Sequence, residues 1–557
     1  MGRKIFKVRH QIAFLLVALF IFLIHRDYGI TFDEEVHLKN GDYVMGWYLS
    51  GFQTDSAVTA KASKFYGGMA DAPVQFVADS ALLLFGWDIY ETRHLLHGLI
   101  GLVGLYYAFR LGKLIVGSEV GGWLSALFLL LTPRYFFGGF NNPKDIPFAV
   151  TYLAAVYYMV KALLMGKLTS GKVMAKIGLT IGMALGVRIG GMLLFPVLVQ
   201  MVLIDLYTHW KERGSQDWEK HLYRLTCCIG LVFALAWLVM LLAWPYVQLN
   251  PITRPFQVMD FMAHNPWDGR IEFFGKVIPA SDTPRMYLPV WIGITLPEFY
   301  HLGLVAMCFA LVVKYFHPKD KRGRMRGVWL VVTATVLPIG VAILLHSTLY
   351  DGIRHFIFVL PLMAILVVWG IVFVWRRISW EPLRWVTGFS FGVLVFVLVG
   401  DLIALHPYES IYFNRTFAGG LAPVAKRFGA DYWGLAYKEG AAWLKAHNKS
   451  AGMTNVGVPF MAKRLTYYFD PETYNARQKN VILRALGLGK WQVPVPEPKY
   501  HIVGPDENSQ EFVKGEYPYF MSGTRLGFDL QNSGPILFEV RRQEALLLVI
   551  KDARRQR

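Results

Sequence analysis

Long apolar segments separated by short polar ones dominate the first 405 residues of the chain. The apolar residues follow one another without the alternation of a barrel strand, and a helix that crosses a bilayer needs about 20 of them. The runs therefore predict eleven transmembrane helices, of which the third and fifth are short. They lie at residues 11–25, 93–110, 120–133, 145–165, 173–187, 190–208, 224–243, 299–316, 327–346, 355–375 and 385–405.

Composition supports this interpretation. Of the 557 residues, 54% are hydrophobic and only 17% are charged, and the mean hydropathy is +0.37. A soluble domain has roughly 45–50% apolar and about 25% charged residues. The sequence thus predicts a polytopic α-helical membrane protein.

The net charge of +18 lies mostly in the short loops. Cations in the short loops of a membrane protein mark its cytoplasmic side. With the N-terminus in the cytoplasm, every second loop is basic, so we expect this orientation in a bacterial inner or plasma membrane and no nucleic-acid partner. The basic N-terminus and first run resemble a signal peptide, but no small-residue cleavage pattern follows, and we interpret them as a retained first helix.

The outer side then carries two larger regions. Residues 71–87 in the first outer loop are apolar and aromatic, and we expect one or two helices there lying in the membrane interface. The polar tail predicts a small α/β domain, with a helix at 434–447 and strands at 452–460, 498–503 and 536–541. The expected division is a membrane domain at 1–405 and an outer domain at 406–557.

Three consecutive carboxylates follow the first apolar run, at Asp33, Glu34 and Glu35. Carboxylates at a membrane edge are costly unless water, a cation or a substrate compensates them. They head an expected short helix with Thr31 as its N-cap and His37 on the face of Asp33. These residues are compatible with three interpretations: a catalytic base, a simple helix anchor or a metal site.

A second polar cluster opens the fourth span. Asn142, Lys144 and Asp145 precede Pro147, which suits the first turn of a helix, and Asp145 suits its cap. A helix N-terminus together with Lys144 can bind an anion. The alternative is that Lys144 only reaches toward the interface and Asp145 only caps the helix.

Two further outer turns carry cations. Arg188 stands between glycines that allow close approach of a ligand, and it can bind phosphate or pair with Asp145. The turn from Tyr350 to His355 holds Arg354, which together with His355 can hold a phosphate or pyrophosphate or merely anchor the loop at the headgroups.

The sequence contains no Walker loop, dinucleotide glycine fingerprint, HExxH or GxSxG motif. An enzyme on the outer face would have no access to ATP or nucleotide sugars. A donor for such an enzyme must therefore arrive attached to a lipid.

Four stretches resemble a known class of enzymes. Residues 31–37, 142–148, 186–191 and 351–361, in this order and on this side, are similar to the GT-C class of membrane glycosyltransferases. They most resemble family 39 and its relatives, the protein O-mannosyltransferase and lipid A aminoarabinose transferase superfamily. With the order of spans, the resemblance covers about residues 10–405.

The resemblance implies an inverting transfer of sugar from a polyprenyl-phosphate donor on the outer face. Asp33 would be the general base and Glu34 its support. No cofactor is implied for the chemistry, although a divalent cation stays open, and the acceptor would be a glycan, lipid or protein. The expected substrate-binding residues are His37, Asn142, Lys144, Asp145, Arg188, Tyr350, Arg354 and His355.

Two other classes of function compete with this one. A lipid-linked sugar flippase would need polar residues along its spans and access from both sides, whereas the spans here are nearly free of charge at mid-depth. A non-catalytic assembly subunit would act through its tail. Substituting Asp33 should then leave its function intact.

Overall fold

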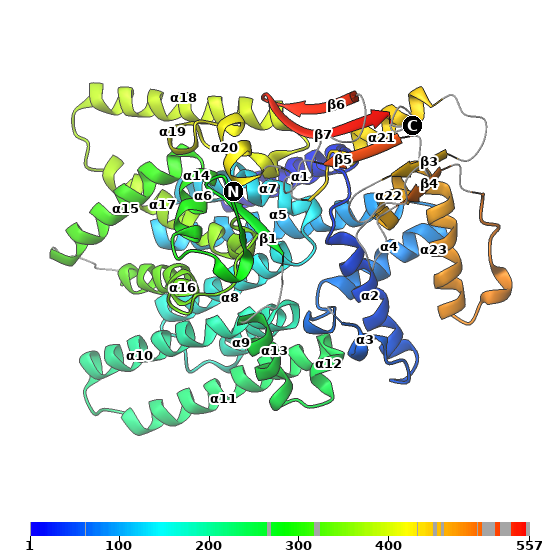
Figure 1. Cartoon of the computed structure of the whole chain (residues 1–557). Helices are drawn as coiled ribbons and strands as arrows, with labels where there is room; N and C mark the ends of the chain where they lie inside the picture. Colours follow the sequence, from blue (N-terminus) through cyan, green and yellow to red (C-terminus); the bar gives the residue numbers. More distant parts are fainter. Residues whose placement is uncertain are drawn as a thin grey trace.

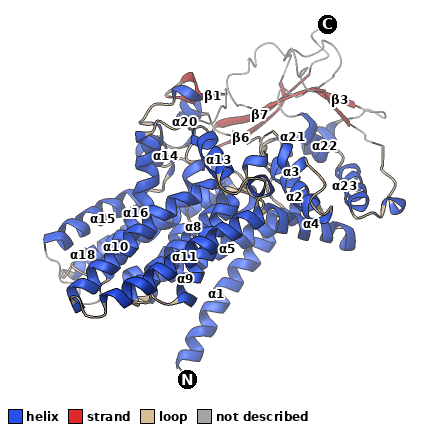
Figure 2. Cartoon of the chain, turned by 90° about the horizontal axis from the view of Figure 1, so that it is seen from below, coloured by secondary structure: helices blue, strands red, loops and turns tan. Residues whose placement is uncertain are grey.

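The computed structural model describes residues 2–61, 63–263, 269–316, 323–429, 431, 433–448, 454–457, 462–497, 500–503, 519–523 and 536–552. Figure 1 shows a bundle of long helices beside a smaller part that contains most of the strands. Seen from below, the strands gather at one end of the bundle and the N-terminus of α1 (Gly2–Ile24) lies at the other (Figure 2).

Eight helical segments in the described part of the chain are long and apolar enough to cross a membrane. The predicted class, a polytopic α-helical membrane protein, is therefore confirmed. The segments are α5 (Ile89–Val116), α8 (Asp145–Leu164), η2–α10 (Ile189–Arg213), α11 (Trp218–Ala243), α15 (Glu298–Phe316), α16 (Arg324–Leu344), η4–α17 (Arg354–Trp375) and α18 (Glu381–Leu405).

The other three predicted spans are shorter or broken. The third is wrong as one straight helix: α6 (Glu119–Leu130) and α7 (Pro133–Asn141) meet at a bend of 67° and together could form a ninth span. Pro133 begins α7 and cannot donate to the preceding turn, which explains the break. The first and fifth correspond to α1 and to the 17-residue α9 (Gly171–Val187).

The segment between the first two predicted spans is helical, as expected. It contains α2 (Glu34–Leu49), α3 (Ser56–Thr59), η1 (Ser63–Phe65) and α4 (Asp71–Phe85). Helix α4 buries the polar side chains of Gln75 and Asp79 and exposes Phe76 and Phe85. Polar residues inside and apolar residues outside are the arrangement expected of a helix that faces lipid.

The described residues between α11 and α15 also form regular elements. It contains α12 (Pro245–Gln248), α13 (Thr253–Ala263), an antiparallel hairpin of β1 (Arg270–Phe273) and β2 (Lys276–Pro279), η3 (Ala280–Asp282) and α14 (Tyr287–Thr295).

The tail contains a mixed five-stranded sheet in the order β4-β3-β5-β7-β6. Its strands are β3 (Thr454–Gly457), β4 (Tyr500–Val503), β5 (Tyr519–Gly523), β6 (Ile536–Arg542) and β7 (Ala545–Asp552). The helix expected at 434–447 is α21 (Tyr437–His447), β3 and β4 lie within their expected strand regions, and β6 extends one residue beyond its region. Residues 452–453, 458–460 and 498–499 of those predictions lie outside the described residues. The remaining tail elements are η5 (Glu409–Ile411), α19 (Arg415–Ala418), α20 (Leu421–Phe428), α22 (Ala462–Phe469), α23 (Pro471–Ala485) and η6 (Gly489–Trp491).

Two side chains of the tail form hydrogen bonds with the backbone just before α2. The Lys438 ammonium donates to the carbonyls of Arg26, Asp27 and Tyr28, at 2.6, 3.0 and 3.1 Å. The Tyr468 hydroxyl bonds the backbone of Ile30. These contacts fix the start of the first outer loop from the far end of the sequence.

Candidate functional site

Asp33 lies between two buried cations. Its Oδ2 is 3.3 Å from Lys144 Nζ and 3.1 Å from an Arg354 guanidinium nitrogen. The side chains of Lys144 and Arg354 are 6% exposed, whereas that of Asp33 is 22% exposed. Three segments far apart in the sequence thus form one charged cluster, in which the carboxylate retains some access from outside.

The two cations control the acidity of Asp33. Burial alone would raise the pKa of this carboxyl, but the neighbouring charges of Arg354 and Lys144 outweigh burial and hold the pKa well below its ordinary value. Without a ligand, the cluster therefore holds Asp33 ionised.

Lys144 is held by the turn between α7 and α8. The Asn142 side chain accepts from the backbone N–H of Asp145 at 2.9 Å and so caps α8. Asp145 is the first helical residue and not the cap, which corrects the expectation. The Lys144 ammonium lies 4.9 Å from the centre of the Tyr66 ring, which adds a cation–π contact to its ion pair.

Arg354 follows a tight turn. Asp351 and Gly352 have φ values of 56° and 72°, a conformation that glycine tolerates and aspartate adopts rarely. Asp351 accepts from Arg354 at 2.9 Å. The guanidinium carbon lies 5.3 Å from the centre of the Tyr350 ring and 5.7 Å from that of Trp433, in the tail.

Arg188 pairs with Asp145, which also accepts from the Asn142 amide at 2.9 Å. Of the two uses considered for Arg188, the structure therefore contains the pair. The Arg188 side chain is 18% exposed, more than that of Lys144 or Arg354. Arg188 follows the last residue of α9. Its partner Asp145 is the first residue of α8, next to Lys144 of the cluster.

Glu34 is oriented differently from Asp33. One of its oxygens accepts from the Thr31 N–H at 2.7 Å and from the Asn141 amide at 2.8 Å, and the other lies 2.7 Å from His94 Nε2. The N-cap position belongs to Asp33, which corrects the assignment of Thr31; Glu34 is the first residue of α2 and accepts from the backbone three residues earlier. Glu34 thus fixes the start of α2, and Asp33 is the acid that faces the cations.

The two histidines have separate partners. His37 Nδ1 lies 2.8 Å from an oxygen of Asp71, which also accepts from Asn40 at 2.8 Å. The His355 ring stands edge-on to that of Tyr350, with ring centres 4.6 Å apart. His37 therefore lies beside the cluster without a side-chain contact to Asp33 in the bonds described.

The metal alternative receives no support from the geometry. Asp33, Glu34 and His37 are directed to three different sets of partners. Throughout the residues that the structure describes, no three His, Cys, Asp or Glu side chains are grouped so that they could hold a metal ion.

The sequence analysis missed several members of this site. Trp433 belongs to a polar tail without a recognisable motif, and Tyr66 lies in an irregular stretch of the first outer loop. His94 and Asn141, which hold Glu34, were equally inconspicuous, although Asn141 directly precedes a residue that was predicted. Only the fold brings these side chains together.

Comparison with known proteins finds similarity among solved structures. No protein-family model matches the chain, and the search of curated proteins gives no match. Among solved structures, the chain is similar to the crystal structure of ArnT from Cupriavidus metallidurans bound to undecaprenyl phosphate. The match has 15% sequence identity and a TM-score of 0.48 and covers 98% of each chain.

Proposed function

We propose that this protein is an inverting membrane glycosyltransferase that uses a polyprenyl-phosphate-linked sugar. The observation that carries the proposal is the position of Asp33 between Lys144 and Arg354. A transfer from a lipid phosphate needs a base for the acceptor hydroxyl and cations for the leaving phosphate, and this cluster offers both.

In the proposed reaction, the acceptor oxygen attacks the anomeric carbon while its proton passes to a carboxylate oxygen of Asp33. The bond between the anomeric carbon and the phosphate oxygen breaks, and the electron pair leaves with the polyprenyl phosphate. Lys144 and Arg354 stabilise the additional negative charge on that phosphate. Arg188 adds a third cation if the donor phosphate separates it from Asp145.

The low pKa of Asp33 fits this scheme because the donor itself changes it. A carboxylate paired with two cations is a weak base. A bound phosphate shares those cations, which removes part of the stabilisation of the ionised form and moves the pKa of Asp33 back toward its ordinary value. Binding of the donor therefore makes Asp33 a stronger base toward the acceptor hydroxyl.

The test is transfer of radiolabelled sugar from undecaprenyl-phosphate donors by purified protein, with a panel of glycan, lipid and protein acceptors. We expect transfer by the wild type, loss of transfer with Asp33→Asn, and normal transfer with Glu35→Gln. Glu35 pairs with Lys39 at 2.6 Å on the surface of α2 and serves as the matched control.

Other outcomes would favour the alternatives. Equal transfer by the wild type and Asp33→Asn would remove Asp33 from the chemistry. Movement of labelled donor between leaflets without transfer would favour a flippase, and the absence of both activities across the panel would favour an assembly subunit.

A further inference from the structure

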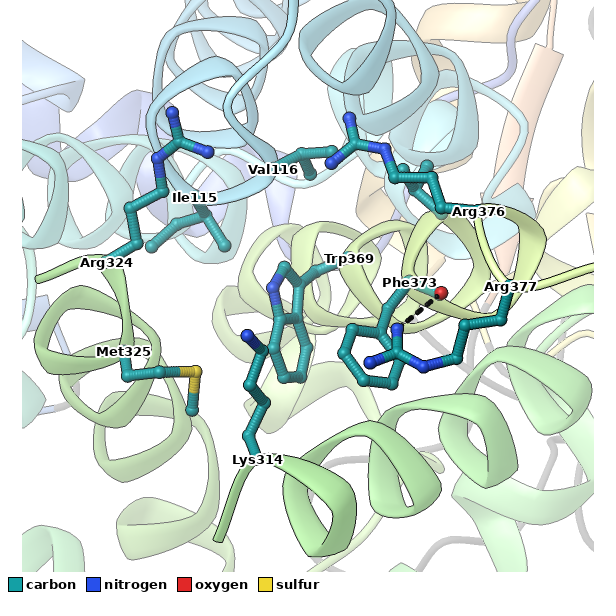
Figure 3. A pocket seen from close by; sticks show the side chains of 10 residues that line it. Ile115, Val116, Lys314, Arg324, Met325, Trp369, Phe373, Arg376 and Arg377 are labelled. Atoms are coloured by element: carbon teal, nitrogen blue, oxygen red, sulfur yellow. Dashed lines mark hydrogen bonds between the residues drawn. The ribbon is translucent and has the colours of Figure 1, made fainter. Parts of the chain in front are cut away.

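A polar cavity lies away from the Asp33 cluster. It has a volume of about 250 Å³ and is bordered by the ends of α5, α15 and α17 and the start of α16. Figure 3 shows the side chains of Lys314, Arg324, Arg376 and Arg377 around it, with Trp369 among its apolar lining. Four cations thus border one cavity, and the described residues that line it include no carboxylate.

This cavity lies at the opposite end of two membrane helices from the Asp33 cluster. The segment η4–α17 begins at Arg354, in the cluster, and ends at Trp375, beside the cavity. Its 22 residues correspond to about 33 Å of helix, close to the thickness of a hydrocarbon core. Helix α5 likewise begins near Glu34, through His94, and ends at Val116 in the cavity wall. The cavity and the cluster therefore face opposite leaflets.

At least three of the four cations have defined contacts, and the Lys314 ammonium lies 5.9 Å from the centre of the Phe373 ring. The Arg377 guanidinium stacks 3.4 Å from the centre of the Phe373 ring and donates to the Phe373 carbonyl at 3.1 Å. The Arg324 guanidinium packs on Gly117, where a Cβ atom would come within 2.0 Å of it. Arg324 and Arg377 thus have defined positions in the wall of the cavity.

Helix dipoles explain only part of this arrangement. Lys314, Arg376 and Arg377 lie at the C-terminal ends of α15 and α17, where cations are favourable. Arg324 is the first residue of α16, and a cation at a helix N-terminus is unfavourable. Arg324 nevertheless adds its positive charge to the wall that carries the other three cations.

We propose that this cavity binds the phosphate group of an anionic phospholipid in the leaflet opposite the Asp33 cluster. The cavity lies at the level where helices end and headgroups begin, and basic pockets of this kind between helices bind anionic lipid heads. Its volume is below the roughly 300–1,000 Å³ of small-molecule pockets, which suits a headgroup. Ile115, Val372 and Phe373 in the lining can contact the acyl chains.

The test measures lipid binding to the full-length protein by native mass spectrometry after removal of co-purified lipid. The wild type, the double variant Arg324→Gln/Arg376→Gln and the control Lys211→Gln/Arg213→Gln are titrated with phosphatidylglycerol or phosphatidylcholine. The control removes two exposed cations from the last turn of α10, outside the cavity. Inorganic phosphate is tested separately as a competitor and as a thermal stabiliser.

We expect phosphatidylglycerol to bind the wild type and the control equally and the double variant about 25-fold more weakly, at about fivefold per cation. If the double variant does not fold, the exposed Arg376→Gln alone should give about fivefold. Equal binding by all variants, or no preference over phosphatidylcholine, would overturn the proposal of a lipid. Stabilisation of the wild type but not the double variant by inorganic phosphate, without lipid preference, would assign the site to free phosphate instead.

Discussion

Replacement of Asp33 by asparagine should have opposite effects on transfer and on carrier binding. Asp33 competes with a ligand phosphate for the cations of Lys144 and Arg354, at 3.3 and 3.1 Å. Asparagine keeps the shape of the side chain and removes the negative charge. We therefore expect the variant to lose its base and to gain affinity for undecaprenyl phosphate.

The magnitude follows from these two distances. At an effective dielectric constant of about 20, each pair has a gross Coulomb attraction of about 5 kcal/mol. Desolvation offsets most of it, and we expect a net gain of about 2 kcal/mol, which is roughly 30-fold tighter binding. Transfer should fall by about 10²- to 10⁴-fold, the usual contribution of a general base.

Calorimetric titration of detergent-solubilised protein with undecaprenyl phosphate measures the first effect, and the sugar-transfer assay measures the second. The Glu35→Gln variant should match the wild type in both. Asp33→Asn should also melt at a lower temperature without ligand, because Lys144 loses its partner, and the carrier should restore that temperature. Unchanged or weaker carrier binding by a folded Asp33→Asn variant would refute the competition on which the reasoning rests.

Three further predictions concern the surroundings of Asp33. Glu34→Gln should lower the free energy of unfolding by about 3–5 kcal/mol, because the buried pair with His94 is broken, and thermal melting compared with Glu35→Gln checks this. A drop in transfer without a drop in melting temperature would instead make Glu34 catalytic. Trp433→Ala removes the ring next to Arg354 and should weaken carrier binding by about 2- to 30-fold in calorimetry, whereas the exposed Trp491→Ala should not. If both tryptophan variants bind like the wild type, Trp433 is no part of the site. Burial, with the nearby charge of Asp42, raises the pKa of Asp79 to about 8, so folded protein holds a proton that unfolded protein releases between the ordinary value of 3.8 and about 8. Stability is therefore lost as pH rises through this window. The melting temperature of Asp79→Asn should exceed that of the wild type by an amount that grows from pH 5 to 8, in contrast to the exposed control Asp282→Asn, and a constant difference would contradict this pKa.

The sequence predicts the parts of this molecule that depend on local pattern. Apolar runs indicate the helices because lipid requires each span to satisfy its own backbone. The acids and cations of the Asp33 cluster are recognisable because they border apolar runs, where a charge is costly unless it is compensated. The same pattern cannot show the 67° angle between α6 and α7, because hydropathy contains no information on the direction of a helix.

The direction of a side chain is the second property that the sequence pattern does not predict. Asp33 and Glu34 are adjacent and chemically alike, yet one faces Lys144 and Arg354 and the other faces His94. That difference depends on where α5 and η4 lie relative to α2, which no local pattern records. The contribution of Trp433 depends likewise on how the tail packs against the membrane helices.

The bracing of residues 26–30 by Lys438 and Tyr468 has a consequence for biosynthesis. The acidic loop leaves the ribosome early, but its contact with Lys438 spans about 410 positions of chain. At about 5–20 residues per second, synthesis of that interval takes roughly 20–80 s. During this time the loop lacks the contacts that fix its backbone. A product that terminates before residue 438 would insert its helices and still lack a fully organised Asp33 site. The site therefore depends on synthesis of the tail.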